Sequence, residues 1–283
     1  MTSKQRFVPT GQVVGLRERA PGHAVIHMLC TEPGSIRSRS RVARFFGVRP
    51  LSTDGYAWFR GALGEIAVGR LLSRLDSKWV VLHAVPVGRG ADIDHVVVGP
   101  SGVFTVNTKN HSGKRVWVAG HTFLVSGSRT DHIRNSEFEG RRAAKLLGKA
   151  LGWPVPIRPV IAVYDPQRLH IEKPPAGVDV VDARRLVRWL KKRPAVLGPE
   201  AVEHIVSVIG ELATWRYQPD ESVDVDRRAQ FDAIQAEIGT ARRVRMAWAF
   251  GMVAVMTITI VLVWPALLQL LTIAVAKLLD GSA

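Results

Sequence analysis

The stretch Asp92-Ile-Asp-His-Val-Val-Val-Gly-Pro-Ser-Gly-Val-Phe-Thr-Val-Asn-Thr-Lys109 decides the fold of this chain. Two runs rich in valine and other β-formers flank Gly-Pro-Ser-Gly, a combination typical of a β-hairpin. If Val98 faces Val103 across the turn, the same register sets Asp94 opposite Asn107 and Asp92 opposite Lys109. Because side chains alternate along a strand, these four polar residues then share one face of the hairpin.

Two interpretations fit this polar end of the hairpin. One is a solvated strand end with an ion pair between Asp92 and Lys109. The other is a metal site for phosphodiester hydrolysis. Carboxylates and an amide oxygen hold Mg²⁺ or Mn²⁺, and an ammonium group stabilises the charge that develops in the transition state.

The composition indicates an anionic partner. The 283 residues include 39 Lys and Arg against 24 Asp and Glu, a formal net charge of +15. So strong a bias favours nucleic acid or the inner surface of a membrane as the partner. The single cysteine, Cys30, excludes an intrachain disulfide and suits a reducing compartment. The first residues lack the apolar run of a secretory signal.

Residues 1–50 are predicted to form a basic, largely irregular N-terminal arm, in which Val25–Cys30 favours a short strand. Such an arm either contacts phosphates or acts as a solubilising tail. A helix is predicted over residues 56–75. On its helical wheel, Glu65 lies away from Arg60, Arg70 and Arg74 and among small and apolar neighbours. Glu65 therefore points inward. A buried carboxylate without a partner costs folding free energy, unless a metal, a lysine or a structural arginine compensates its charge.

The segment 51–192 is predicted to form an α/β domain. Strands are expected at residues 79–87, 157–163 and 178–181 besides the hairpin, with further strands at 116–118 and 123–125. Helices are expected at 135–151 and 183–192, and the segment 193–217 is expected to form a packing helix that starts at Pro199 and runs to about Tyr217. The sum predicts a three-layer α/β/α architecture with a central mixed sheet. The helix 135–151 carries Arg141, Arg142 and Lys145, which either track a nucleic-acid backbone or form an ordinary solvated face.

The C-terminal part is predicted to cross a membrane. Residues 218–245 read as an acidic linker followed by a basic juxtamembrane helix, and residues 246–276 carry no charge. The 19 residues before Pro265 rise about 28 Å as a helix, close to the thickness of the hydrocarbon core. Arginines crowd the N-terminal flank, whereas Lys277 begins a short tail, 277–283. The positive-inside bias therefore predicts a single-pass protein of the cell membrane whose main domain faces the cytoplasm.

Four motifs together resemble the nuclease-related domain, a family placed in the PD-(D/E)XK superfamily. They are Gly61-Ala-Leu-Gly-Glu65, Asp92-Ile-Asp-His95, Gly99-Pro-Ser-Gly-Val-Phe-Thr-Val106 and Lys109-Asn110. The resemblance covers residues 56–165 and implies a restriction-endonuclease-like core. It makes Glu65 the helix carboxylate, Asp94 the metal-binding aspartate and Lys109 the lysine of the acidic-x-Lys motif.

Two positions depart from the family pattern. Asn107 stands where the family normally has Glu or Asp, and Glu139 stands where a glutamine is usual. An asparagine donates a neutral oxygen to a metal but supplies no charge and cannot serve as a base.

The sequence therefore predicts a membrane-anchored nuclease-like protein. Its metal ligands are Glu65, Asp94 and Asn107, and Lys109 completes the catalytic set. The residues expected to lie along bound nucleic acid are Asp92, Arg141, Arg142 and Lys145. The alternatives are a binding module that tethers nucleic acid without cleaving it, and an interaction protein whose basic charge meets anionic lipid.

Overall fold

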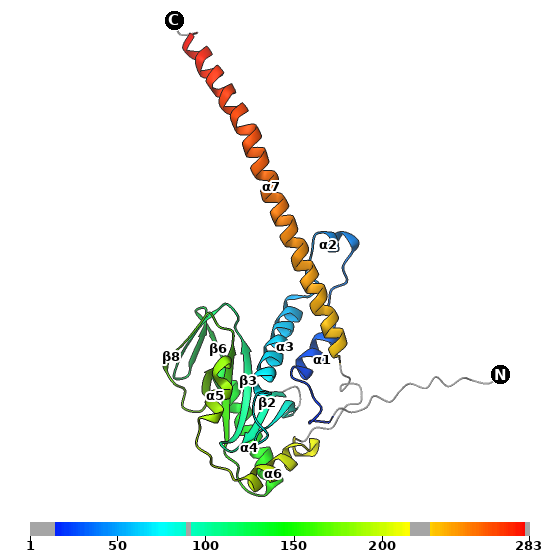
Figure 1. Cartoon of the computed structure of the whole chain (residues 1–283), viewed down its shortest axis with the longest axis vertical. Coiled ribbons are helices and arrows are strands. Elements are labelled where there is room, and N and C mark those ends of the chain that lie inside the picture. The colour runs from blue at the N-terminus through cyan, green and yellow to red at the C-terminus, as the bar shows by residue number, and fades with distance from the viewer. Residues whose placement is uncertain (1–14, 89–91, 216–226, 281–283) are drawn as a thin grey trace, which may run out of the picture. The chain divides into compact units, whose positions relative to one another are not determined.

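A computed structural model describes residues 15–88, 92–215 and 227–280, with side chains through Val275 (Figure 1). The first residues of the predicted N-terminal arm and the predicted acidic linker at 218–226 lie outside this part. The chain divides into two units. Unit 1 comprises residues 1–35 and 53–231, and unit 2 comprises residues 36–52 and 232–283.

Unit 1 is built on a five-stranded mixed sheet of order β1-β2-β3-β7-β9. Its antiparallel part consists of β1 (Val80–Pro86), β2 (Asp92–Gly99) and β3 (Gly102–Asn110). Its parallel part adds β7 (Ile157–Tyr164) and β9 (Asp179–Asp182) to β3. The mixed sheet predicted from the sequence is confirmed.

The hairpin of β2 and β3 has the predicted register at its turn. Val98 pairs with Val103, and the ladder continues to the pair of His95 and Val106. Asp94 and Asn107 follow directly after this last pair. The ladder between β2 and β3 ends there and does not include the predicted pair of Asp92 and Lys109. On the other edge of β2, Asp92 pairs with Pro86 of β1.

Helices cover both faces of the central sheet, as predicted for a three-layer α/β/α fold. On one face, Val97, Phe104 and Val106 pack against α3 (Thr53–Leu72) and α5 (Leu186–Lys191). On the other face, Val96, Val98 and Val103 pack against α4 (His132–Leu151) and α6 (Pro199–Ile209). Alternate residues of each strand of the hairpin thus enter two different cores, which explains the nearly continuous apolar character of both strands.

A second sheet of four strands has the order β6-β5-β4-β8. It comprises β4 (Arg115–Ala119), β5 (Thr122–Val125), β6 (Ser128–Thr130) and β8 (Arg168–Lys173). Its buried residues Val116, Val118 and Phe123 join a third core with Ile161 and Val163 of β7. The sequence predicted β4 and β5 but not β6 or β8, because the polar segments Ser128–Thr130 and Arg168–Lys173 carry little apolar periodicity.

The predicted strand Val25–Cys30 is wrong, because these residues form helix α1 (His23–Thr31). Ile26 and Leu29, three residues apart, are buried there and α1 packs on α3, so tertiary packing overrides the strand preference of Val25 and Ile26. A second short helix, α2 (Arg41–Phe45), also lies within the segment predicted to be irregular. The packing helix ends earlier than predicted, at Ile209, and the 3-10 helices η1 (Ala183–Arg185) and η2 (Leu212–Trp215) complete the set.

Helix α7 (Arg228–Asp280) continues through Pro265. It contains an 18-residue window with a mean hydropathy of 2.3, none of which is buried in the structure. By length and composition it is the one candidate membrane span found within the described residues.

Candidate functional site

The predicted site residues come from three elements of unit 1. Asp94 lies near the start of β2, directly before the residues that pair with β3. Asn107 and Lys109 lie near the end of β3, and Glu65 lies in the second half of α3. Asp94 and Lys109 both shift the pKa of Glu65, and Lys109 also shifts the pKa of Asp94, so the structure brings these three charged groups within electrostatic range of one another. A fourth element, α4, adds Glu139, which the sequence analysis did not place in the site.

Glu65 is buried, with 5% of its surface exposed, as the helical wheel predicts. Burial raises the pKa of Glu65 well above its ordinary value, and the carboxylate of Asp94 raises it further. Lys109 and a hydrogen bond from the backbone N–H of Gly22 lower the pKa again, but they do not cancel the effect of burial. Glu65 is therefore a carboxylate that a cation would stabilise.

Asp94 is half-buried and held at the strand end by Thr108. The backbone N–H of Thr108 donates to the Asp94 carboxylate at 2.5 Å. Burial raises the pKa of Asp94, whereas Lys109 and the hydrogen bonds from Thr108 lower it. These contacts fix the carboxylate in position and keep a positive charge beside it.

Asn107 and Glu139, the two residues that depart from the family pattern, contact each other. The amide Nδ2 of Asn107 donates to the Glu139 carboxylate at 2.6 Å. The other end of the amide, Oδ1, is buried and has no hydrogen-bond partner among the described residues. Burial raises the pKa of Glu139, the hydrogen bond from Asn107 lowers it, and Asp94 raises it. Glu139 thus brings an acidic group to the site next to the position where Asn107 provides only an amide.

Two histidines lie at the border of this cluster. His111 follows β3, His132 begins α4, and their Nε2 atoms are 3.2 Å apart. Burial lowers the pKa of His111 to about 4 and that of His132 to about 3, and the nearby charge of Lys109 contributes to both shifts. Both rings are therefore neutral at neutral pH. His95, by contrast, faces the other side of the sheet, where its Nδ1 lies 2.8 Å from Nδ1 of His83.

The residues predicted to bind nucleic acid are spread over different environments. Asp92 is exposed and contributes to the raised pKa of Glu65. Arg141 and Lys145 are exposed on α4, and Arg141 forms an ion pair with Glu137 at 3.7 Å. Arg142 is half-buried because its guanidinium group lies against Gly88. The basic face of α4 is therefore narrower than the sequence suggests.

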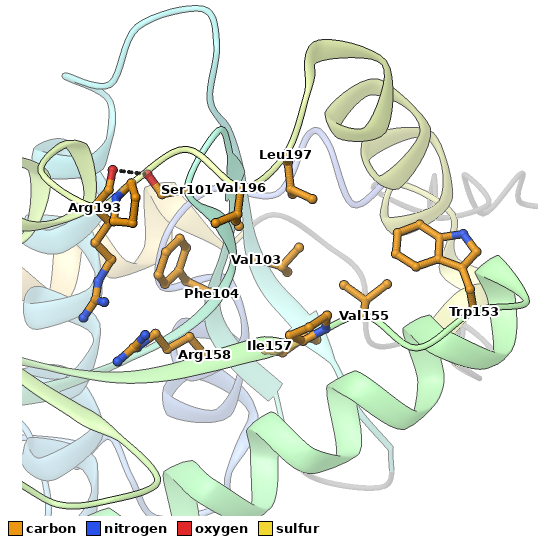
Figure 2. Close-up of a pocket in the computed structure, with 13 residues that line it drawn as sticks. Ser101, Val103, Phe104, Trp153, Val155, Ile157, Arg158, Arg193, Val196 and Leu197 are labelled. Atoms are coloured by element: carbon orange, nitrogen blue, oxygen red, sulfur yellow. Dashed lines mark hydrogen bonds between the residues drawn. The ribbon is translucent and has the colours of Figure 1, made fainter.

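Figure 2 shows a pocket of about 530 Å³ at the other end of the hairpin. Phe104, Val155 and Ile157 supply apolar walls, and the Ser101 hydroxyl donates to the backbone oxygen of Arg193 at 3.2 Å. Arg193 also pairs with Asp179. None of Glu65, Asp94, Asn107 and Lys109 lines this pocket, so it is separate from the candidate site.

The donor atoms at the candidate site suit a hard divalent cation. Two carboxylates, Glu65 and Asp94, and the unpartnered Oδ1 of Asn107 offer oxygen ligands, which Mg²⁺ and Mn²⁺ prefer. Within the described ranges, however, no three His, Cys, Asp or Glu side chains are arranged as a group that could hold a metal.

Comparisons with known proteins agree with the resemblance seen in the sequence. The family model of the nuclease-related domain matches residues 60–164, which contain Glu65, Asp94, Asn107, Lys109 and Glu139. An uncharacterized protein of Bacillus anthracis is 45% identical over 67 residues, which are 22% of this chain and 30% of that protein. The match thus spans less than a third of the length of this curated relative. No solved structure matches the chain significantly. The predicted resemblance to the nuclease-related domain is confirmed.

Proposed function

We propose that the nuclease-related domain of this chain hydrolyses phosphodiester bonds of DNA or RNA with the help of Mg²⁺ or Mn²⁺. The observation that carries this proposal is a pair of carboxylates, the buried Glu65 and the half-buried Asp94, beside the ammonium group of Lys109. Burying two acids close together costs stability in the metal-free protein, and this cost is expected where the acids serve a cation. The match of residues 60–164 supports the same reading.

Each residue has a distinct part in this proposal. Glu65, Asp94 and Oδ1 of Asn107 would hold the ion, which supplies a polarised phosphate and a water of lowered pKa when it is bound. Glu139 orients the Asn107 amide through the hydrogen bond to Nδ2, so that Oδ1 is left free. Lys109 stabilises the negative charge that develops on the phosphoryl oxygens. Thr108 holds Asp94 in place.

The test is cleavage of supercoiled plasmid, single-stranded DNA and RNA by the full chain in detergent, with Mg²⁺ or Mn²⁺. Wild type is expected to cleave at least one substrate. Asp94→Ala and Lys109→Ala are each expected to lose activity by a factor of roughly 10² or more. A matched control is Asp165→Ala, which removes an exposed carboxylate at the end of β7. Equal cleavage by wild type, Asp94→Ala and Lys109→Ala would refute the mechanism.

A second candidate function is nucleic-acid binding without hydrolysis. Asn107 favours it, since this residue adds no charge at a position that is normally acidic. In that case, binding of a labelled oligonucleotide persists with a chelator present and in Asp94→Ala, and it weakens steeply as salt is raised. Loss of binding in Asp94→Ala would speak against this alternative.

We further propose that α7 anchors the protein in the cell membrane, with unit 1 in the cytoplasm. Residues 246–276 carry no charge, and the arginines Arg242, Arg243 and Arg245 precede them directly. Labelling of single cysteines by an impermeant maleimide in intact cells tests this orientation. A cysteine at position 121 should be protected and one at position 281 should react, whereas the reverse pattern would refute the orientation.

A further inference from the structure

Residues 36–52 form a strap along α7 within unit 2. Arg39 pairs with Glu237, a terminal nitrogen of Arg245 donates to the backbone oxygen of Gly47, and Nε1 of Trp248 donates to the backbone oxygen of Phe45 at 2.8 Å. Gly47 also packs so closely on α7 that a Cβ atom there would lie 2.5 Å from the backbone oxygen of Ala241. The strap is thus bound along α7 at several successive points.

The partners on α7 lie on one face of the helix. Glu237, Ala241, Arg245 and Trp248 are spaced four, four and three residues apart, the spacing of neighbours on a helix surface. From Glu237 to Trp248 the helix rises about 16 Å. Trp248 is the second residue after Met246, where the uncharged part of α7 begins. The part of the strap around Phe45 therefore reaches the level on α7 where the candidate membrane span starts.

The tip of the strap exposes a cluster of apolar side chains at this level. Phe45 and Phe46 are 60% and 52% exposed, although both rings contact Trp248 at centroid distances of 5.0 and 5.4 Å. Val42, on α2, is 65% exposed. Figure 1 shows α2 beside α7. Tryptophan and tyrosine, whose rings carry a polar group, are enriched at the boundary between membrane and water, and Trp248 belongs to this cluster.

Arginines surround this apolar tip. The strap contains five arginines and no acid, and residues 232–245 of α7 contain three arginines against Asp232 and Glu237. Arg37, Arg41, Arg44 and Arg49 are exposed on the strap, and Arg242 and Arg243 are exposed on α7. Clustered basic residues directly beside a membrane span are attracted to anionic lipid headgroups.

We propose that the strap is an interfacial anchor that inserts Val42, Phe45 and Phe46 into the headgroup region of the bilayer while its arginines bind anionic lipid. This inference rests on the membrane part of the proposed function, because it requires α7 to cross the bilayer. Exposed apolar side chains at the end of a basic segment are the pattern of helices that lie in the membrane interface. A nucleic-acid partner for these arginines would leave the apolar tip in water.

The experiment places an environment-sensitive fluorophore on single cysteines of the full chain, in a Cys30→Ser background, after reconstitution into nanodiscs. Val42→Cys reports on the strap, Val255→Cys reports on α7, and His121→Cys on the second sheet is the water-exposed control. The discs contain either zwitterionic lipid or a mixture with anionic lipid, and brominated lipids quench labels that enter the bilayer. In anionic discs, the label at position 42 is expected to shift to the blue and to be quenched.

Removal of charge tests the role of the arginines. Arg41→Gln and Arg44→Gln are each expected to reduce the ratio of buried to water-exposed label about fivefold, since one arginine near an anionic surface contributes about 1 kcal/mol. The charge-matched control variants Arg129→Gln and Arg168→Gln, on the second sheet, should leave that ratio unchanged. An equal loss from both sets would overturn the proposal.

The remaining outcomes separate the inference from its premise. A label at position 42 that stays in water while the label at position 255 is quenched would overturn the interfacial anchor and leave the membrane span intact. A label at position 255 that is not quenched would overturn both. A spectral shift at position 42 that requires an oligonucleotide rather than anionic lipid would assign the strap to nucleic acid and overturn the proposal.

Discussion

Exchanging the acid and the amide of the Asn107–Glu139 pair should leave the stability of unit 1 nearly unchanged, although each single change is costly. Asn107→Asp alone sets a second carboxylate against Glu139 across a contact of 2.6 Å in a largely buried place. Two buried like charges without a partner should cost roughly 3 kcal/mol. Glu139→Gln alone replaces a charge-assisted hydrogen bond by a neutral one and should cost about 1 kcal/mol. The double variant restores one acid and one amide with the donor reversed.

Urea unfolding of the full chain in detergent, with a chelator present and tryptophan fluorescence as the signal, measures these differences. The double variant is expected to lie within about 1 kcal/mol of wild type, so the coupling energy between the two sites is roughly 3 kcal/mol. A matched control pair on the same helix is Asn135→Asp with Glu137→Gln, whose effects should be additive. Additive losses at positions 107 and 139 would refute the idea that these residues act as one pair.

Three further predictions concern pH, the buried acid and the strap. Burial lowers the pKa of His83 from 6.5 to about 4, so between these pH values the unfolded chain binds a proton that the folded chain does not bind. This difference should lower the stability by up to roughly 3 kcal/mol as pH drops from about 6.5 to 4. In thermal unfolding, His83→Gln but not His121→Gln should flatten this decline. The pKa of Glu65 is raised above 4.5, so the metal-free protein should lose stability as pH rises above that value. Glu65→Gln should be more stable than wild type at pH 7 without metal, but Mn²⁺ should raise its stability less. A variant that is less stable than wild type and equally stabilised by Mn²⁺ would contradict the site. Gly47→Ala places a Cβ atom at a left-handed φ of 65° and against the backbone of α7, so it should release the strap from the helix. Faster tryptic cleavage after Arg44 measures this release. Gly34→Ala, at a φ of 78° but with open space around it, should not speed the cleavage.

The central sheet was predictable because the residues of each strand specify it locally, through runs of β-forming residues that end at turn residues. Val98 and Val103 flank a Gly-Pro-Ser-Gly turn, and the valine runs on either side specify a hairpin buried on both faces. The segment Val25–Cys30 was not predictable in this way, because its β-branched residues favour a strand and the contact of Ile26 and Leu29 with α3 decides for a helix. The strap was missed for the same reason, since its partners on α7 lie about 200 residues away.

The candidate site was predictable only where spacing along one element fixes the geometry. The wheel of α3 places Glu65 inside, and alternation along the hairpin places Asp94 beside Asn107. The role of Glu139 depends on how α4 packs on β3, which no local pattern specifies. Its one signal in the sequence was a coincidence of two departures from the family pattern, Asn107 and Glu139, that the structure joins by a hydrogen bond.

Residues 53–231, the larger part of unit 1, lie in the sequence between the strap and the rest of unit 2. Arg39 and Glu237 are 198 residues apart, and Phe45 and Trp248 are 203 apart. A shortened protein that ends before residue 232 would therefore lose every described α7 partner of the strap. Val42, Phe45 and Phe46 would then form an exposed hydrophobic patch that promotes aggregation. Truncations intended to yield a soluble nuclease-related domain should remove residues 36–52 together with the C-terminal helix.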